Sequence, residues 1–256
     1  KKNLFLIEDC SQAHGATYKG KKVGSFGHIS TWSFCQDKIM STGGEGGMIS
    51  TSNTKLWLKL WSLKDHGKNY KSVFNKKHNN QFKWLHDDLG SNYRMTEMQA
   101  VIGRDQLKSL DKQIKKRNLI ANLYLNGLKD YYLKYDILKK PKFKYQTNHL
   151  KQNSKKNNQY LHAFYRLNFF VNKNKVKLNQ LIKELNKNKI NCGVGSCPEI
   201  YREKIFKKLK LYPNKRLSNA KLLGESSLTF SINPYKSLTK IKSEISIINK
   251  KIKKYI

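Results

Sequence analysis

Ser33-Phe34-Cys35-Gln36-Asp37-Lys38 is the stretch of sequence that decides the fold, and a glycine cluster, Gly43-Gly44-Glu45-Gly46-Gly47, follows it closely. Residues 29–34 form an apolar run that predicts a β-strand. Lys38 would therefore stand just past the end of a strand, beside glycines that let a backbone approach a ligand. A structural hairpin would use the same glycines, and lysine is common in this chain. This block alone therefore does not predict any chemistry; a second functional residue elsewhere in the sequence is required.

That residue is Asp9 in Glu8-Asp9-Cys10-Ser11-Gln12, directly after the apolar run Leu4–Ile7. Such a run is typical of a parallel strand buried on both faces, and open α/β sheets bind ligands at the carboxyl ends of their strands. Alone, Asp9 can equally cap a helix. Together with Lys38 it predicts a pyridoxal phosphate (PLP) site. A lysine amine forms a Schiff base with the aldehyde, and a carboxylate keeps the pyridine nitrogen protonated.

Further polar residues extend the predicted site. Ser33 offers a hydroxyl to a phosphate at a strand end, and Gln12 would lie along the ring or near its phenolic oxygen. Asn92 precedes a capping box at Thr96–Gln99 and would donate to a phosphate, although turn chemistry explains the same residues. His14 is a weaker candidate, because a buried structural histidine is the favoured interpretation of this residue.

The charge of the chain limits the classes of function. Lys and Arg total 52 and Asp and Glu total 17, which gives a formal net charge of +35. Such a balance suggests a nucleic acid or an anionic membrane as partner. Only six of the basic residues are arginine, the type that phosphate and base recognition prefers. Compositional drift toward lysine and asparagine is therefore favoured over nucleic-acid binding. A basic surface would still attract an anionic small substrate.

The cysteines indicate the cellular compartment, and the start of the chain indicates whether the sequence is part of a longer protein. The four cysteines show neither a CxxC pair nor metal-ligand spacing, which predicts free thiols in a reducing cytoplasm and no metal site. No apolar run is long enough to cross a membrane. The chain enters its first predicted strand almost at once, and we expect that an N-terminal part of a longer protein is missing.

The C-terminal half predicts a small α/β domain. Residues 161–171 alternate strictly between apolar and polar, as in a strand with one buried face. Helical spacing follows at 176–185 and again from Ile241 to Ile252.

A long helix that starts at the capping box and continues to residue 128 would lead out of the first domain. The sequence therefore predicts two domains, residues 1–127 as part of a PLP-binding large domain and residues 128–256 as a small C-terminal domain. Residues 68–88 are expected to form a loop or flap, and residues 139–159 a connection.

These blocks, in this order, resemble the sugar aminotransferases of the DegT/DnrJ/EryC1/StrS family, a fold-type-I PLP group. The resemblance covers residues 8–100 well and the C-terminal half only loosely. The matching blocks are Glu8–Ala16, Gly24–Gly27, Ser33–Lys38, Gly44–Gly47, His66-Gly67 and Asn92–Ala100.

The resemblance implies a role for each predicted site residue. Asp9 would pair with the pyridine nitrogen, Gln12 would lie beside the ring, and Ser33 would bind the phosphate. Lys38 would form the Schiff base with the cofactor. Asn92 would reach the phosphate of the neighbouring subunit, which implies a homodimer. The reaction implied is transfer of an amino group, from glutamate, onto a nucleotide-linked keto-sugar.

Two departures and three alternatives accompany this interpretation. The family's N-terminal phosphate loop and ring-stacking aromatic residue have no counterpart here, and Gln36-Asp37 is unusual ahead of the lysine.

Related sugar dehydratases use the amine form of the cofactor and carry histidine in place of the lysine, which Lys38 argues against. A non-catalytic or regulatory homologue of the same fold stays open, as does a basic nucleic-acid binder.

Overall fold

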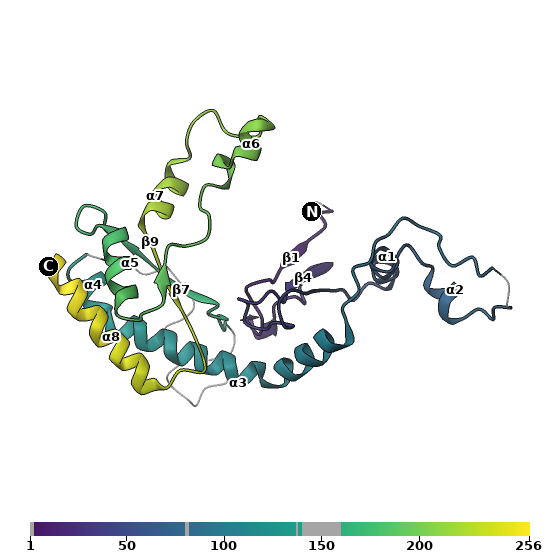
Figure 1. Ribbon diagram of the computed structural model, residues 1–256, viewed down its shortest axis with the longest axis horizontal. Coiled ribbons are helices and arrows are strands. Elements are labelled where there is room, and N and C mark those ends of the chain that lie inside the picture. The colour runs from purple at the N-terminus through teal and green to yellow at the C-terminus, as the bar shows by residue number, and fades with distance from the viewer. Residues whose placement is uncertain (1–2, 80–81, 137, 140–159) are drawn as a thin grey trace. The chain divides into compact units, whose positions relative to one another are not determined.

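The computed structural model describes residues 3–79, 82–136, 138–139 and 160–256 (Figure 1). These residues form two compact units. Within the described residues, the first runs to Lys112 and takes in residues 160–163, and the second comprises the remainder from Gln113 onward. All but the first residue of the predicted connection at 139–159 lies outside the description. The predicted domains, 1–127 and 128–256, remain a proposal.

The first unit is built on a three-stranded sheet of order β1-β4-β5. β1 (Ile7–Asp9) runs parallel to β4 (Ile29–Ser33), and β4 runs antiparallel to β5 (Gly47–Ser50). Because β1 and β4 are parallel, their carboxyl ends meet at the same edge of the sheet.

The strand predicted over Leu4–Ile7 is wrong in its position and its burial. β1 begins only at Ile7, because its partner strand begins opposite it at Ile29. The preceding apolar side chains face solvent, with Leu4 73% and Phe5 79% exposed, and Ile7 itself is 64% exposed. β1 is an edge strand among the described residues, and its own side chains are exposed or half-buried.

A two-stranded hairpin follows β1. β2 (Thr17–Tyr18) pairs antiparallel with β3 (Lys21–Lys22), and the turn uses Lys19 at φ 49° and Gly20 at φ 78°. The left-handed backbone at the turn is the conformation that glycine adopts without strain.

Two capped helices come after the sheet. Asn53 accepts a hydrogen bond from the Leu56 backbone at the start of α1 (Thr54–Lys64). Asn69 caps α2 (Tyr70–Phe74) in the same way. The predicted loop at 68–88 therefore contains a short helix. It packs on α1 through edge-to-face aromatic contacts, such as Trp57 with Tyr70 at 5.1 Å between ring centroids.

The longest helix, α3 (Glu97–Gly127), begins at the predicted capping box. The Gln99 backbone donates to Thr96 Oγ1 at 3.3 Å, and the Thr96 backbone donates to Gln99 Oε1 at 3.0 Å. The capping box is thus confirmed, with both free backbone donors satisfied.

The second unit has a four-stranded antiparallel sheet of order β6-β7-β9-β8. In chain order the strands are β6 (Leu138–Lys139), β7 (Arg166–Val171), β8 (Cys192–Gly193) and β9 (Ser227–Ser231). The helices of this unit, besides the end of α3, are α4 (Lys129–Leu133), α5 (Leu178–Lys187), η2 (Ile200–Arg202), α6 (Lys204–Lys208), α7 (Ser218–Ser226), α8 (Leu238–Ile252) and η3 (Lys253–Tyr255).

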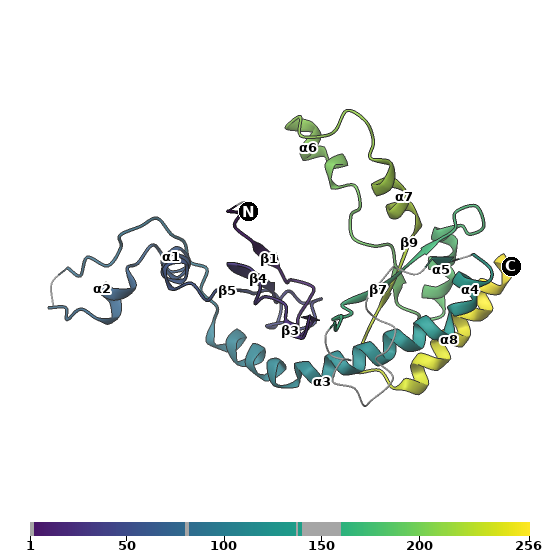
Figure 2. The same ribbon diagram turned by 180° about the vertical axis from the view of Figure 1, so that it is seen from behind.

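The core of the second unit lies on one face of this sheet. Of the strand predicted over 161–171, only β7 forms, and before it Phe164 is buried at 1% exposure where the alternation placed a solvent-facing residue. Leu167, Phe169 and Val171 alternate inward from β7, as predicted, and pack with buried side chains of α3, α5 and α8. α5 and α8 lie side by side in both views (Figures 1 and 2). Arg117 of α3 is only 8% exposed and donates from Nη1 to the carbonyls of Phe164 at 3.1 Å and Ile232 at 2.7 Å.

None of the described helices is long and apolar enough to span a bilayer. All four cysteines are free thiols, with Cys10 and Cys192 buried.

Candidate functional site

The carboxyl edge of the β1–β4 pair carries two of the predicted residues. Asp9 is the last residue of β1 and Ser33 the last residue of β4. Strand pairing continues one residue further, because the Cys10 backbone donates to the Thr31 carbonyl at 2.9 Å. The sheet therefore holds a carboxylate and a hydroxyl on neighbouring strand ends, where α/β sheets bind ligands.

Asp9 does not cap a helix. Its Oδ1 accepts from the Ser11 backbone at 3.0 Å, and a turn leads on to β2. The hydroxyl and the backbone N–H of Ser11 stabilise the ionised form and outweigh burial, so the pKa of Asp9 lies below its ordinary value. The carboxylate is therefore an anion at neutral pH, which is the state that a protonated ring nitrogen needs.

Lys38 lies in the turn that follows β4. Its backbone donates to the Cys35 carbonyl at 3.0 Å, and its side chain is 15% exposed. Lys38 Nζ lies 2.9 Å from Oδ1 of Asp37, the residue that departs from the family pattern. Ser33 Oγ accepts from the Cys35 backbone at 3.4 Å, so Ser33 and Lys38 both contact the residue between them.

The glycine cluster returns the chain from this turn to the sheet. The Phe34 backbone donates to the Gly46 carbonyl at 2.8 Å. A side chain at Gly46 would meet Thr42 Oγ1 at 2.2 Å, so the tight return needs glycine there. α3 holds the same loop, because Gln106 Nε2 donates to the Ser41 carbonyl at 2.7 Å and Gln99 Nε2 to that of Glu45 at 2.8 Å. The glycines thus have the hairpin role that the sequence left open.

The remaining predicted residues have different surroundings. Gln12 is exposed in the turn after Asp9. Asn92 pairs with Asp65 through a backbone bridge and accepts from Arg94 Nε at 3.1 Å. The contacts of Asn92 are thus with Asp65 and Arg94, and its predicted role in a neighbouring subunit's site stays a prediction.

His14 has the structural surroundings that the sequence favoured. It is 2% exposed and packs against the rings of Trp32 and Phe34, with centroids 5.4 and 5.8 Å away.

Glu8 is the important residue that sequence reasoning missed. Its carboxylate accepts from the backbones of Gly24 at 2.8 Å, Phe26 at 2.7 Å and Gly27 at 2.6 Å. Burial raises the pKa of Glu8, but these three donors outweigh it and place the pKa below its ordinary value. The available signal was the Gly24–Gly27 block, since a glycine-rich loop exposes N–H groups that an anion can accept.

An apolar cavity of about 830 Å³ lies elsewhere in the first unit. It is lined by β4, β5, α1 and the segment before α3, and Trp32, Met48, Trp57, Trp61, Lys64 and Arg94 are among its residues. None of Asp9, Gln12, Ser33, Lys38 and Asn92 lines this cavity. The predicted site is therefore the strand-end edge and not the cavity.

The donor set at that edge fits PLP. An ionised carboxylate, a hydroxyl, an amide and a primary amine are the groups that would meet its ring nitrogen, phosphate, phenolic oxygen and aldehyde. The parallel strands and the turn after β4 supply three of these four groups from one edge.

Comparison with known proteins identifies the family. The family model of the DegT/DnrJ/EryC1/StrS aminotransferase family matches residues 1–245. A GDP-perosamine synthase from Escherichia coli is 42% identical over 127 residues, which are 50% of this chain and 32% of the relative. The protein MJ1066 of Methanocaldococcus jannaschii is 30% identical over 236 residues, 91% of this chain and 56% of the relative.

A solved structure extends the likeness to the fold. The aminotransferase from Psychrobacter cryohalolentis superposes with a TM-score of 0.88 at 42% identity, over 99% of this chain and 63% of that one. The chain therefore covers less than two thirds of the length of each of these relatives. This chain belongs to the DegT/DnrJ/EryC1/StrS aminotransferase family and has the α/β fold of the fold-type-I PLP enzymes.

Proposed function

We propose that the protein is a PLP-dependent aminotransferase that moves an amino group, from glutamate, onto a nucleotide-linked keto-sugar. The observation that carries the proposal is the single edge at which Asp9 and Ser33 end parallel strands, with Lys38 in the turn after the second. The substrate class is supported by the GDP-perosamine synthase, whose name specifies a sugar carried on GDP.

Each residue has a defined task in this proposal. Asp9, held ionised by Ser11, faces the ring nitrogen. Gln12 lies beside the ring, and the Ser33 hydroxyl donates to the phosphate. When bound, PLP supplies an electron sink for the bond that breaks at the substrate carbon. Lys38 Nζ would hold the cofactor until the substrate amine displaces it, and the freed amine would then take the proton from the amino acid Cα and, in the second half-reaction, return one to the sugar carbon.

The proposal extends to assembly and location. Asn92 would complete the site of a second copy, so we propose a homodimer. We place the protein in the cytoplasm, where free thiols such as those of Cys35 and Cys197 stay reduced.

A visible absorbance spectrum with added PLP tests the assignment of Lys38. The wild-type protein, Lys38→Ala and the matched control Lys59→Ala are each treated with borohydride and digested, and the masses of the peptides are measured by mass spectrometry. We expect a cofactor band and a reduced adduct on the Lys38 peptide in the wild type and in Lys59→Ala. We expect neither in Lys38→Ala. An adduct on a different lysine, or none in the wild type, would overturn the assignment.

The response of the PLP absorbance band to glutamate distinguishes an aminotransferase from a non-catalytic homologue and from a dehydratase. Loss of the PLP band upon addition of glutamate, followed by its return with a keto-sugar nucleotide, is expected of an aminotransferase. A band that does not respond to glutamate would favour the non-catalytic homologue. Deoxygenation of the sugar without amination would favour the dehydratase.

A further inference from the structure

Within the first unit, backbone hydrogen bonds connect the end of α1 to the segment that carries Asn92. The Ser91 backbone donates to the Leu63 carbonyl at 2.9 Å. On the other side of Asn92, the Tyr93 backbone donates to the Lys64 carbonyl at 3.0 Å. Both chain neighbours of Asn92 are therefore bonded to the last turn of α1, which gives the backbone of Asn92 a defined position.

Two glycines bring the same parts of the chain into close contact. Gly67 has φ 76°, and a Cβ there would lie 1.7 Å from the Asp88 carbonyl oxygen. A Cβ at Gly90 would lie 2.2 Å from the Gly67 backbone nitrogen. Because only residues without a side chain allow this approach, the two segments pack backbone against backbone. The fold therefore positions the residues that lead up to Asn92.

One carboxylate lies at this junction. Asp65 directly follows α1, pairs with Asn92 through a backbone bridge and is only 9% exposed. Its Oδ1 accepts from Lys68 Nζ at 3.0 Å, and its Oδ2 lies 3.5 Å from Lys64 Nζ. Burial raises the pKa of Asp65, but these two cations and Arg94 outweigh burial and keep the pKa below its ordinary value. The carboxylate is therefore an anion at neutral pH.

Arg94 connects this carboxylate to the side chain of Asn92. Arg94 Nε lies 4.0 Å from Asp65 Oδ1 and donates to Asn92 Oδ1 at 3.1 Å. The Arg94 backbone donates to the same Asn92 oxygen at 3.4 Å. Because both donors bind Oδ1, the amide has one preferred orientation. Among the described residues no hydrogen bond is found for Asn92 Nδ2, so its two N–H bonds are available to an acceptor.

We propose that Asp65 is a positioning residue, which acts through Arg94 to orient the Asn92 amide as a donor to the cofactor phosphate of a second copy. The inference rests on the proposed function, in which Asn92 completes the neighbouring site. An amide that is oriented before binding loses little rotational freedom when the phosphate arrives. Asp65 itself would not bind the phosphate, because an ionised carboxylate has no hydrogen to donate.

A double-mutant cycle on cofactor affinity tests whether Asp65 acts through Asn92. PLP is titrated into the wild type, Asp65→Asn, Asn92→Ala and the double variant, and the Kd is obtained from the absorbance band. We expect each single variant to weaken the Kd about tenfold, and the double variant to stay within about twofold of Asn92→Ala. Independent losses that multiply to about a hundredfold in the double variant would overturn the proposal. So would an unchanged Kd in Asp65→Asn.

Asp87→Asn is the matched control, because it removes a carboxylate from the same segment. Asp87 Oδ2 accepts from Asn69 Nδ2 at 2.6 Å, at the other end of this segment from Asn92. We expect the Kd for PLP to change about twofold or less in this variant. A loss equal to that of Asp65→Asn would show that only the charge of the segment matters, and would overturn the positioning role.

Arg94→Gln gives a second test that does not alter the buried carboxylate. The Arg94 side chain is 49% exposed, and Asp65 keeps its contact with Lys68 when Arg94 is replaced. This variant therefore decides the question even if Asp65→Asn fails to fold. We expect a Kd for PLP about tenfold weaker than that of the wild type. An unchanged Kd would overturn the proposal.

Mixed dimers show in which copy Asp65 acts. Lys38→Ala and Asp65→Asn chains with different affinity tags are produced together, and dimers that carry both tags are purified. One site of such a dimer combines the Lys38 of one copy with the intact Asp65 and Asn92 of the other. We expect that site to bind PLP with the Kd of the wild type, although neither parent does. Dimers of Lys38→Ala with Ser33→Ala should not recover, because Ser33 and Lys38 serve the same site from one copy. An absence of recovery with Asp65→Asn would overturn the proposal.

Failure of this proposal can be distinguished from failure of the proposed function. A wild-type protein without an adduct at Lys38 would refute the aminotransferase and the positioning role together. An adduct at Lys38, formed with a PLP affinity that does not depend on Asp65, would refute the positioning role alone.

Discussion

Glu8 Oε1 lies 2.6 Å from the backbone nitrogen of Gly27, and this contact joins the end of β1 to the loop that precedes β4. The same carboxylate accepts two more backbone donors from the loop. Glu8 therefore organises the approach to the strand on which Ser33 lies, and it directly precedes Asp9 in β1.

Glu8→Gln should destabilise the first unit. Replacing an ionised acceptor of three backbone donors by an amide removes charge-assisted hydrogen bonds, for a loss of about 1–3 kcal/mol in the free energy of unfolding. Urea denaturation measures it. The control is Asp105→Asn, whose carboxylate is 81% exposed and pairs with Lys108 at 3.9 Å. Its effect should stay below about 0.5 kcal/mol, and equal effects would contradict the role of Glu8.

Gly24→Ala and Gly20→Ala separate steric conflict from backbone strain. Both glycines have positive φ, 87° and 78°, but a Cβ at Gly24 would lie 2.3 Å from Trp32 Cζ2, whereas nothing lies within 4 Å at Gly20. Each variant should lose about 1–2 kcal/mol from the left-handed backbone. Gly24→Ala should lose roughly 1–3 kcal/mol more and alter Trp32 fluorescence. Thermal unfolding compares them, and equal melting temperatures would refute the clash.

Tyr124→Phe tests a buried hydrogen bond in the second unit. Tyr124 is 2% exposed and donates to Glu244 Oε2 at 2.8 Å, and Glu244 also pairs with Lys236 at 2.7 Å. Loss of a donor to a buried charge should cost about 1.5–3 kcal/mol. Tyr132→Phe removes a bond to a neutral carbonyl at 2.9 Å and should cost about 1 kcal/mol. The prediction fails if denaturant midpoints show the reverse order.

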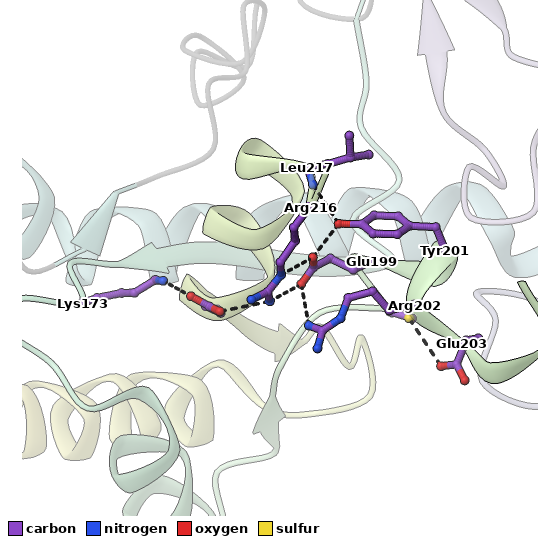
Figure 3. Close-up of polar contacts among 9 residues, drawn as sticks. Lys173, Glu199, Tyr201, Arg202, Glu203, Arg216 and Leu217 are labelled. Carbon is purple, nitrogen blue, oxygen red and sulfur yellow. Dashed lines mark hydrogen bonds and ion pairs between the residues drawn. The ribbon is translucent and has the colours of Figure 1, made fainter. Parts of the chain in front are cut away.

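The hydrogen bonds that Glu199 accepts from Arg216, Tyr201 and Arg202 should make residues 200–217 sensitive to acid (Figure 3). The pKa of Glu199 is lowered from 4.5 to about 2, so its contribution to stability is complete above pH 4.5 and declines as the pH falls toward 2. Hydrogen exchange in residues 200–217 should therefore speed up across that window, after correction for intrinsic rates. In the Glu199→Gln variant, hydrogen exchange in these residues should already be fast at pH 7 and should not become faster as the pH falls. If the exchange rate increased equally with falling pH in the wild type and in Glu199→Gln, the acid sensitivity would come from groups other than Glu199.

Local signals made much of the fold predictable. Residues 29–34, the capping box at Thr96 and the alternation before Val171 each specify one element through its own residues. The structure has the first two, and it has the third over 166–171 only. Asp9 and Ser33 could be placed at strand ends for the same reason. The family and the fold class, predicted from ordered blocks, are confirmed.

What the sequence could not provide depends on neighbours that are distant along the chain. Leu4–Ile7 has the composition of a buried strand, but a strand needs a partner along its length and burial needs packing against its faces. β4 starts too late to pair with the first of these residues, and their side chains are exposed. The bonds of Glu8 with Gly27 and of Glu199 with Arg216 cross 19 and 17 residues, and no periodicity records them. The roles in cofactor binding that were assigned to Asp9, Gln12, Ser33, Lys38 and Asn92 all stay predictions.

The arginines show where this protein needs directional donors and not merely positive charge. Five of the six donate hydrogen bonds through the guanidinium, namely Arg94, Arg117, Arg166, Arg202 and Arg216. Buried Arg117 bridges two carbonyls, which a single lysine ammonium would reach with different geometry. Exposed lysines such as Lys59 and Lys242, for which the described residues provide no ion pair, have no such constraint. Charge at positions of this kind can therefore be redesigned, for solubility or crystallisation, without disturbing the contacts that hold the chain together.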